Sequence, residues 1–126
     1  MEKPKKNPNQ VTGNAGLFYA SYQLAVRGWN VLSTSRNSKG PDIFIYSQDG
    51  KKMYKIQVKA LSKLNHVNPG SMDSWLMNDF VIICTNVYTN PDVYIARPKQ
   101  FTINKHGWIS KDTYTRFKDN WKIIKS

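Results

Sequence analysis

The chain has 126 residues, of which 40% are hydrophobic and 13% aromatic, and this composition indicates one folded domain rather than a disordered segment. No apolar run approaches the ~20 residues that a membrane-spanning helix needs, and a single cysteine, Cys84, rules out an internal disulfide framework and a thiolate zinc site. Nineteen Lys and Arg residues against eight Asp and Glu give a net charge of +11. This surplus favours a polyanionic partner such as nucleic acid over the alternative that the charge only reflects a coding bias. We therefore expect a cytoplasmic protein that binds nucleic acid and no membrane, with Cys84 as a small buried hydrophobe.

The N-terminal part of the chain predicts a tail followed by a helix. Residues 1–11 contain three lysines and two prolines, which predicts a flexible basic tail, and residues 12–126 predict a single domain. The helix is expected to begin near Thr12 and to end before Gly28, which suits the left-handed position after a helix end. Its apolar stripe at helical spacing consists of Leu17, Ala20, Leu24 and Ala25.

The rest of the chain predicts three strands, a long loop, two strands and a terminal helix. The first strand is expected at residues 29–35, the next two within 40–60, and the loop at 61–78. The last two strands are expected at 80–86 and 92–98, and the helix at 110–124. The run FVIICTN at 80–86 is apolar throughout, which is typical of a central strand buried on both faces. Ser110 is the expected cap of the terminal helix. This order of elements predicts a mixed α/β or α+β domain.

The stretch GPDIFIYSQDGKKMYKIQVKA at residues 40–60 predicts a hairpin that gathers polar side chains. Asp49-Gly50 between two strand-like runs predicts a two-residue primed turn, in which the numbers of opposed residues sum to 99. Asp42 then lies opposite Gln57, and Lys59 follows one step along the same face. A register slip of one residue would separate them. The opposite face, which we expect to contact the core, carries Ile43, Ile45, Tyr54, Ile56 and Val58.

This pattern resembles the PD-(D/E)XK nuclease superfamily. A Pro-Asp on one strand is followed, on its hairpin partner, by a carboxylate or amide residue, any residue, and Lys, here Gln57, Val58 and Lys59. The opening helix, which ends in Arg-Gly before a strand and a polar loop, is similar to the Holliday-junction-resolvase branch, and the likeness covers about residues 13–85. The resemblance implies a restriction-endonuclease-like αβββαβ core, with a central mixed sheet flanked by helices.

The same resemblance implies a chemistry for each residue. Phosphodiester hydrolysis in this superfamily uses Mg²⁺ or Mn²⁺, and magnesium prefers oxygen ligands. By resemblance, Asp42 is the central ligand, Gln57 a second ligand and the carbonyl of Val58 a third. Lys59 would hold the attacking water or neutralise the scissile phosphate.

Two positions depart from the family pattern. Gln57 stands where the family usually has Glu or Asp, and it brings no negative charge. The acidic residue that resolvase-like members carry on the first helix corresponds here to Leu17 or Asn14, and Glu2 is the only glutamate in the chain. Asp79, at the head of the predicted buried strand, could supply a carboxylate, although its Asn-Asp context favours a turn.

Other polar and aromatic residues give weaker indications. We expect Arg36 and Lys39, in the loop before Asp42, to contact phosphate, with an ordinary polar loop as the alternative. Lysines on and after the hairpin extend the basic surface, among them Lys55 and Lys63. Three tryptophans are expected to be core or lid residues rather than base-stacking platforms: Trp75, Trp108 and Trp121. His66 and His106 lie in loops without metal-ligand spacing, so we expect no catalytic role for either.

Three functional hypotheses follow. The first is a metal-dependent DNA endonuclease of restriction or resolvase type. Because the chain is small, cutting both strands of a duplex would suggest a homodimer. The second is a nucleic-acid-binding module on the same fold, in which the loss of carboxylates at Gln57 and Leu17 has weakened or removed hydrolysis. The third is a protein-interaction subunit whose charge is incidental. Metal dependence and salt dependence distinguish the three.

Overall fold

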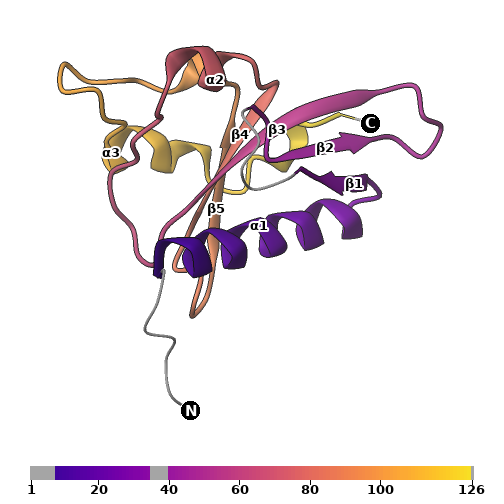
Figure 1. The fold of residues 1–126 in the computed structure, drawn as a ribbon, viewed down its shortest axis with the longest axis horizontal. Helices are drawn as coiled ribbons and strands as arrows, with labels where there is room; N and C mark the ends of the chain where they lie inside the picture. The colour runs from indigo at the N-terminus through magenta and orange to yellow at the C-terminus, as the bar shows by residue number, and fades with distance from the viewer. Residues whose placement is uncertain (1–7, 35–39, 126) are drawn as a thin grey trace.

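The computed structural model describes residues 8–34 and 40–125 and has one five-stranded sheet with helices on both sides (Figure 1). The elements in chain order are α1 (Pro8–Val26), β1 (Asn30–Ser33), β2 (Ile43–Tyr46), β3 (Met53–Ala60), α2 (Met72–Leu76), β4 (Phe80–Thr85), β5 (Asp92–Ala96), η1 (Pro98–Gln100), α3 (Lys111–Tyr114), η2 (Thr115–Phe117) and η3 (Trp121–Ile123). The strands lie in sequence order, and only β3 and β4 pair in parallel. The predicted α+β class with a mixed central sheet is confirmed.

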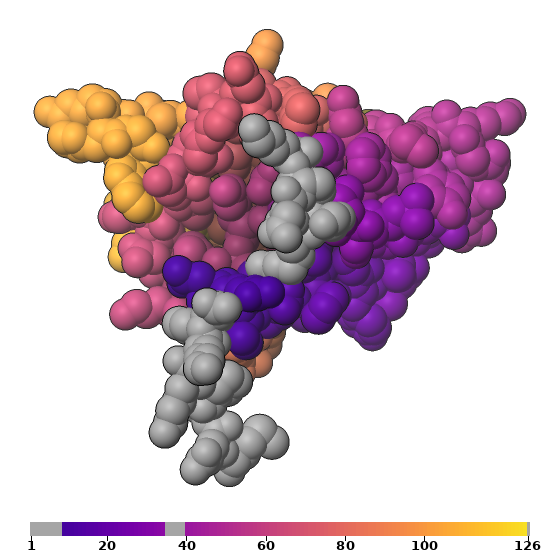
Figure 2. Space-filling model, in the orientation of Figure 1, coloured from indigo at the N-terminus to yellow at the C-terminus, as the bar shows by residue number. Residues whose placement is uncertain are grey.

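The β2–β3 hairpin and the loop of residues 102–108 project at opposite ends of the molecule (Figures 1 and 2). Within the described ranges, no helix is both long enough and apolar enough to cross a bilayer.

Helix α1 covers one face of the sheet and begins earlier than the sequence indicated. It starts at Pro8 rather than near Thr12, so residues 8–11 are helical, while residues 1–7 of the predicted tail lie outside the described part of the chain. Proline is well tolerated in the first helical turn, because N–H groups there have no acceptor within the helix and the N–H that proline lacks therefore costs no hydrogen bond. Of the predicted stripe, Ala20 and Leu24 are fully buried, whereas Ala25 is exposed.

The close approach of α1 to the sheet depends on Gly16. A Cβ built at this position would lie 2.4 Å from the Cβ of Ala60 and 3.7 Å from the Cβ of Cys84. Atoms cannot approach this closely, so the helix would have to move away from β3 and β4. The core on this side contains Ala20, Leu24, Trp29, Ile43, Ile45, Ile56, Phe80, Ile82, Cys84, Val93, Ile95 and Ile124.

The opposite face of the sheet is covered by the connections around α2 and α3. The predicted long loop at 61–78 contains the short helix α2, whose N-cap Ser71 accepts a hydrogen bond from the backbone N–H of Ser74. Its buried Trp75 donates its indole N–H to the carbonyl of Pro98 at 3.1 Å, which ties α2 to the segment after β5. This second core contains Val67, Trp75, Val81, Ile83, Tyr94, Ala96, Phe101, Ile109 and Tyr114.

Strand β4 is buried along its whole length, as its apolar sequence predicted. Alternate residues of β4 contribute to the two cores, with Ile82 and Cys84 on the α1 side and Val81 and Ile83 on the other. Burial, with a smaller contribution from the charge of Asp92, raises the pKa of the Cys84 thiol to about 12. The thiol therefore stays protonated at neutral pH, in keeping with its predicted role as a small buried hydrophobe.

The predicted terminal helix is wrong in its length, although its cap is right. Ser110 accepts a hydrogen bond from the N–H of Asp112, but α3 has only four residues before the chain continues through η2 and η3. The helix cannot continue because Lys118 forms a bridge with Tyr94 on β5 and Asp119 has a left-handed φ of 52°.

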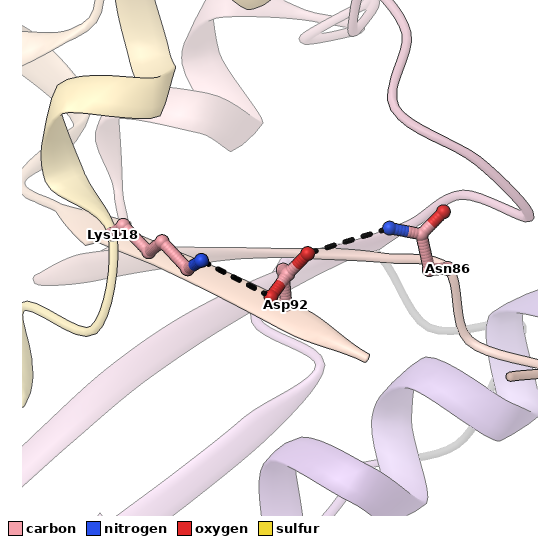
Figure 3. A network of polar contacts seen from close by, with 3 residues as sticks. All are labelled: Asn86, Asp92 and Lys118. Carbon is pink, nitrogen blue, oxygen red and sulfur yellow. Dashed lines mark hydrogen bonds and ion pairs between the residues drawn. The ribbon is translucent and has the colours of Figure 1, made fainter. Parts of the chain in front are cut away.

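The carboxylate of Asp92 lies between the side chains of Lys118, at 3.5 Å, and Asn86, at 3.4 Å (Figure 3).

We expect Gly16→Ala to lower the free energy of unfolding by about 1–3 kcal/mol, measured by urea denaturation. Alanine favours a helix by about 1 kcal/mol relative to glycine, so a net loss would identify the contact with the sheet as the cause. The double variant Gly16→Ala/Ala60→Gly removes the Cβ that the new methyl group meets. It should recover part of the loss, and simple additivity of the two changes would contradict this explanation.

Candidate functional site

The β2–β3 hairpin has the register that the sequence predicted. Ile43 pairs with Ile56 and Tyr46 with Met53, so opposed numbers sum to 99 and Asp42 stands opposite Gln57. The turn, however, is not the predicted two-residue primed type, because Asp49 does not have a positive φ. Gly50, at φ 75°, donates its N–H to the carbonyl of Ser47 instead.

The carboxylate of Asp42 is held by β3. Its Oδ2 accepts hydrogen bonds from the backbone N–H of Val58 at 2.8 Å and from the Nε2 of Gln57 at 3.0 Å. The backbone of Asp42 extends the ladder by donating its N–H to the carbonyl of Ile56 at 3.0 Å. Two neutral donors from β3 therefore contact the same carboxylate oxygen of Asp42.

Lys59 completes the predicted group of three residues. It is partly buried, and this burial lowers the pKa of its ammonium group below the usual 10.5, although the negative charge of Asp42 acts in the opposite direction. Perturbed lysines of this kind are common at functional sites, because a lysine that releases its proton more easily can exchange protons with a substrate or a water. The structure thus brings Asp42, Gln57 and Lys59 together.

A cavity of about 110 Å³ lies beside Asp42, between α1 and the sheet. Its lining residues are Gly13, Leu17, Thr34, Asp42 and Val58. Of the two helix positions that correspond to the acid of resolvase-like proteins, Leu17 lines the cavity and Asn14 does not. The cavity therefore combines one carboxylate with an apolar side chain at the position where a second carboxylate was sought.

The other aspartates do not supply the missing charge. The Oδ2 of Asp79 accepts a hydrogen bond from the N–H of Lys55 at 2.8 Å, and the N–H of Asp79 returns one to the carbonyl of Lys55. Asp79 therefore fixes the start of the β3–β4 ladder through Lys55. Among residues 8–34 and 40–125, no three His, Cys, Asp or Glu side chains lie close enough together to hold a metal ion.

The predicted phosphate contacts divide into two pairs. Arg36 and Lys39 lie outside the described residues. Lys55 and Lys63 are exposed, as a contact to phosphate requires, but neither belongs to the group around Asp42. The lysines at the hairpin tip, Lys51 and Lys52, are also distant from Asp42. They lie about five residues from it along the hairpin, which is roughly 16 Å at the usual rise of a strand.

The sequence analysis missed a second polar cluster. Trp75 and Trp121 pack in the cores as expected, but the side chain of Trp108 is 43% exposed. Trp108 lies with His66 and His106 along a groove of about 420 Å³. The two histidines are far apart in the sequence, and their segments are brought together by long-range contacts such as the pairing of Val67 with Ile109, so no local motif could have indicated this groove.

The chain was compared with models of known protein families and with curated proteins, and neither comparison gave a match.

The pKa of Lys59 provides a test of its contact with Asp42. Replacing Asp42 with Asn removes the charge that raises this pKa, so we expect the pKa to fall further below 10.5. An NMR titration of the lysine side-chain carbons would measure it, with Asp73→Asn, an exposed change in α2, as the control. An unchanged pKa in Asp42→Asn would contradict the proximity of the two charges.

The same shift has a defined effect on stability. Because the pKa is lower in the folded state, the folded protein binds fewer protons than the unfolded chain at pH values just below 10.5. The charged ammonium group of Lys59 therefore destabilises the fold at neutral pH, and this effect diminishes as the pH rises towards the pKa of the unfolded chain.

Proposed function

We propose that the protein is a metal-dependent endonuclease that hydrolyses phosphodiester bonds in DNA. The observation that carries this proposal is the convergence of Asp42, Gln57 and Lys59 beside a cavity at the edge of α1. A carboxylate, an amide and a cationic amine in one cluster suit a phosphate group and a hard cation. The net charge of +11 supports a polyanionic substrate.

The donor set around Asp42 fits a magnesium or manganese ion after one rearrangement. Gln57 now directs its Nε2 at Asp42, and its amide must turn so that Oε1 takes that place. Asp42, Gln57 and the carbonyl of Val58 would then offer oxygen atoms only, which is the ligand type that Mg²⁺ prefers. The ion would lower the pKa of a bound water and stabilise charge on the phosphate. Lys59 would hold that water or neutralise the phosphate.

Cleavage of both strands of a duplex implies two copies of a chain this small, and we propose a homodimer. Helix α1 supports this, because none of its 19 residues is charged although the chain as a whole carries +11. Its outer side exposes Phe18, Tyr22 and Val26 by 64%, 62% and 59%. An uncharged apolar face allows two copies of a basic protein to approach without opposing like charges.

The first test is cleavage of supercoiled plasmid, linear duplex and a four-way junction in Mg²⁺ or Mn²⁺, with and without EDTA. We expect metal-dependent cleavage that Asp42→Ala abolishes, because this change removes the only carboxylate described at the cavity. Binding of the same DNA in EDTA should persist in the variant. Asp73→Ala, an exposed change of the same type in α2, serves as the matched control.

If cleavage survives in Asp42→Ala, the activity comes from a contaminant or from another site. Binding without cleavage, equal in both proteins, would favour the second candidate function.

That second candidate is a nucleic-acid-binding module without hydrolysis, and a specific contact favours it. Gln57 donates a hydrogen bond from Nε2 to the carboxylate of Asp42 and brings no negative charge of its own. Leu17 contributes no charge to the cavity. Such a module would bind nucleic acid with a steep salt dependence that is the same with and without metal.

The variant Gln57→Glu distinguishes these candidates through metal binding. Without metal, we expect a loss of roughly 1.5–3 kcal/mol of stability, because a hydrogen bond to a charged group is replaced by repulsion between two carboxylates. Mg²⁺ should restore this stability and raise the melting temperature of the variant more than that of the wild type.

Differential scanning fluorimetry across a magnesium series measures this effect. Gln48→Glu makes the same change at the hairpin tip and should show no extra response to Mg²⁺. An equal response of Gln57→Glu and Gln48→Glu would mean that the cluster around Asp42 cannot hold the ion.

A further inference from the structure

The groove beside Trp108 is separate from the cavity at Asp42, and the two share no lining residue. It lies between the segment that carries His66 and the loop of residues 102–108, which projects from the body of the molecule at one end (Figures 1 and 2). Its lining residues are Asn65, His66, Asn104, His106 and Trp108. Its volume of about 420 Å³ falls in the range typical of small-ligand sites, about 300–1,000 Å³.

The two sides of the groove are held together by buried residues. Val67 and Ile109 pair through two backbone hydrogen bonds of 2.8 and 2.9 Å, and both side chains are buried. The hydroxyl of the buried Tyr114 donates a hydrogen bond to the carbonyl of Asn65. The groove is therefore preformed, and a ligand does not have to order either side.

The loop that presents Trp108 is fixed by its own hydrogen bonds. The Oδ1 of Asn104 accepts from the backbone N–H groups of His106 and Trp108, each at 3.0 Å. Gly107, at φ 84°, donates its N–H to the carbonyl of Asn104. The backbone that carries Trp108, which is 43% exposed, is thus held in place.

His66 is oriented in the same way. Its Nδ1 accepts a hydrogen bond from the backbone N–H of Lys111 at 3.2 Å. With Nδ1 as acceptor, the ring hydrogen is on Nε2, which can act as a hydrogen-bond donor. Asn65, Asn104 and His106 add further polar groups along the groove.

We propose that this groove binds one unpaired nucleobase of a single-stranded or locally opened nucleic acid, with Trp108 as the stacking surface. An exposed indole flanked by amide and imidazole groups can stack on the base and bind its polar edges. Lys105 lies in the same loop and is exposed, which places a cation near the backbone of such a ligand. The proposal rests on the proposed nucleic-acid partner but not on hydrolysis at Asp42.

The test compares base-bearing and abasic strands, with the full-length protein in EDTA so that no cleavage occurs. Fluorescence anisotropy would measure the affinity for a short labelled oligothymidine, for an abasic oligomer with the same number of phosphates, and for oligouridine. We expect the wild type to prefer the base-bearing strands by about tenfold, since one stacked base contributes on that order. Trp108→Ala should abolish this preference, and Trp108→Phe should keep part of it.

Tyr88→Ala, which removes an exposed aromatic side chain between β4 and β5, is the matched control and should keep the preference. Equal affinity of the wild type for base-bearing and abasic strands would overturn the base-binding site and leave the nucleic-acid partner intact. An equal loss of affinity for both strands in Trp108→Ala would also overturn it, because stacking acts on the base alone. The absence of binding to any strand would overturn both proposals. The DNA and RNA arms show which sugar the site accepts.

Discussion

The register of the β2–β3 hairpin determines the position of every polar residue in the candidate site. Ile43, Ile45 and Ile56 are fully buried against α1, and each contributes roughly 1.5–3 kcal/mol by leaving water. A slip of one residue would turn one strand's isoleucines to the opposite face of the sheet. Core packing therefore forces Asp42 to stand opposite Gln57. The polar cluster is a consequence of this apolar constraint and does not have to stabilise itself.

This constraint also explains why the carboxylate of Asp42 lies against β3, because the register places Asp42 beside the donors of that strand. Asp42 receives two N–H groups from β3, one from the backbone of Val58 and one from the side chain of Gln57. Neutral donors satisfy a carboxylate without the repulsion that a glutamate at position 57 would introduce. Lys59 experiences the attraction of Asp42, but its pKa is lowered because the effect of burial is larger.

The sequence predicted those features that follow from alternation and burial. The hairpin register, the fully buried β4 and the roles of Ala20 and Leu24 all depend on the spacing of apolar residues, which is visible in one sequence. The type of turn at Asp49-Gly50 was wrong, because several turns give the same register and the Ser47 side chain, which bonds to Asp49, selects among them.

The C-terminal region was less predictable because its structure depends on distant contacts. The spacing of Tyr114 and Phe117 suits a helix, but the bridge between Tyr94 and Lys118 draws the chain along β5 instead. The groove at Trp108 was missed for the same reason, since His66 and His106 line one groove through long-range contacts such as the pairing of Val67 with Ile109. Propensity describes neighbours along the chain, whereas these features are produced by neighbours in space.

The path of the chain after β3 relates the two candidate sites to each other. Seven peptide steps separate Lys59 from His66, so their Cα atoms lie at most ~25 Å apart even if the connection were fully extended. Successive phosphates of one strand in B-form DNA advance by about 3.4 Å along the axis, so this limit corresponds to roughly seven nucleotides. A strand of that length could therefore span the distance between Lys59 and His66. A base held in the groove would restrict which phosphates of that strand can reach Asp42, so the groove would set where the strand is positioned even if the cluster around Asp42 does not hydrolyse it.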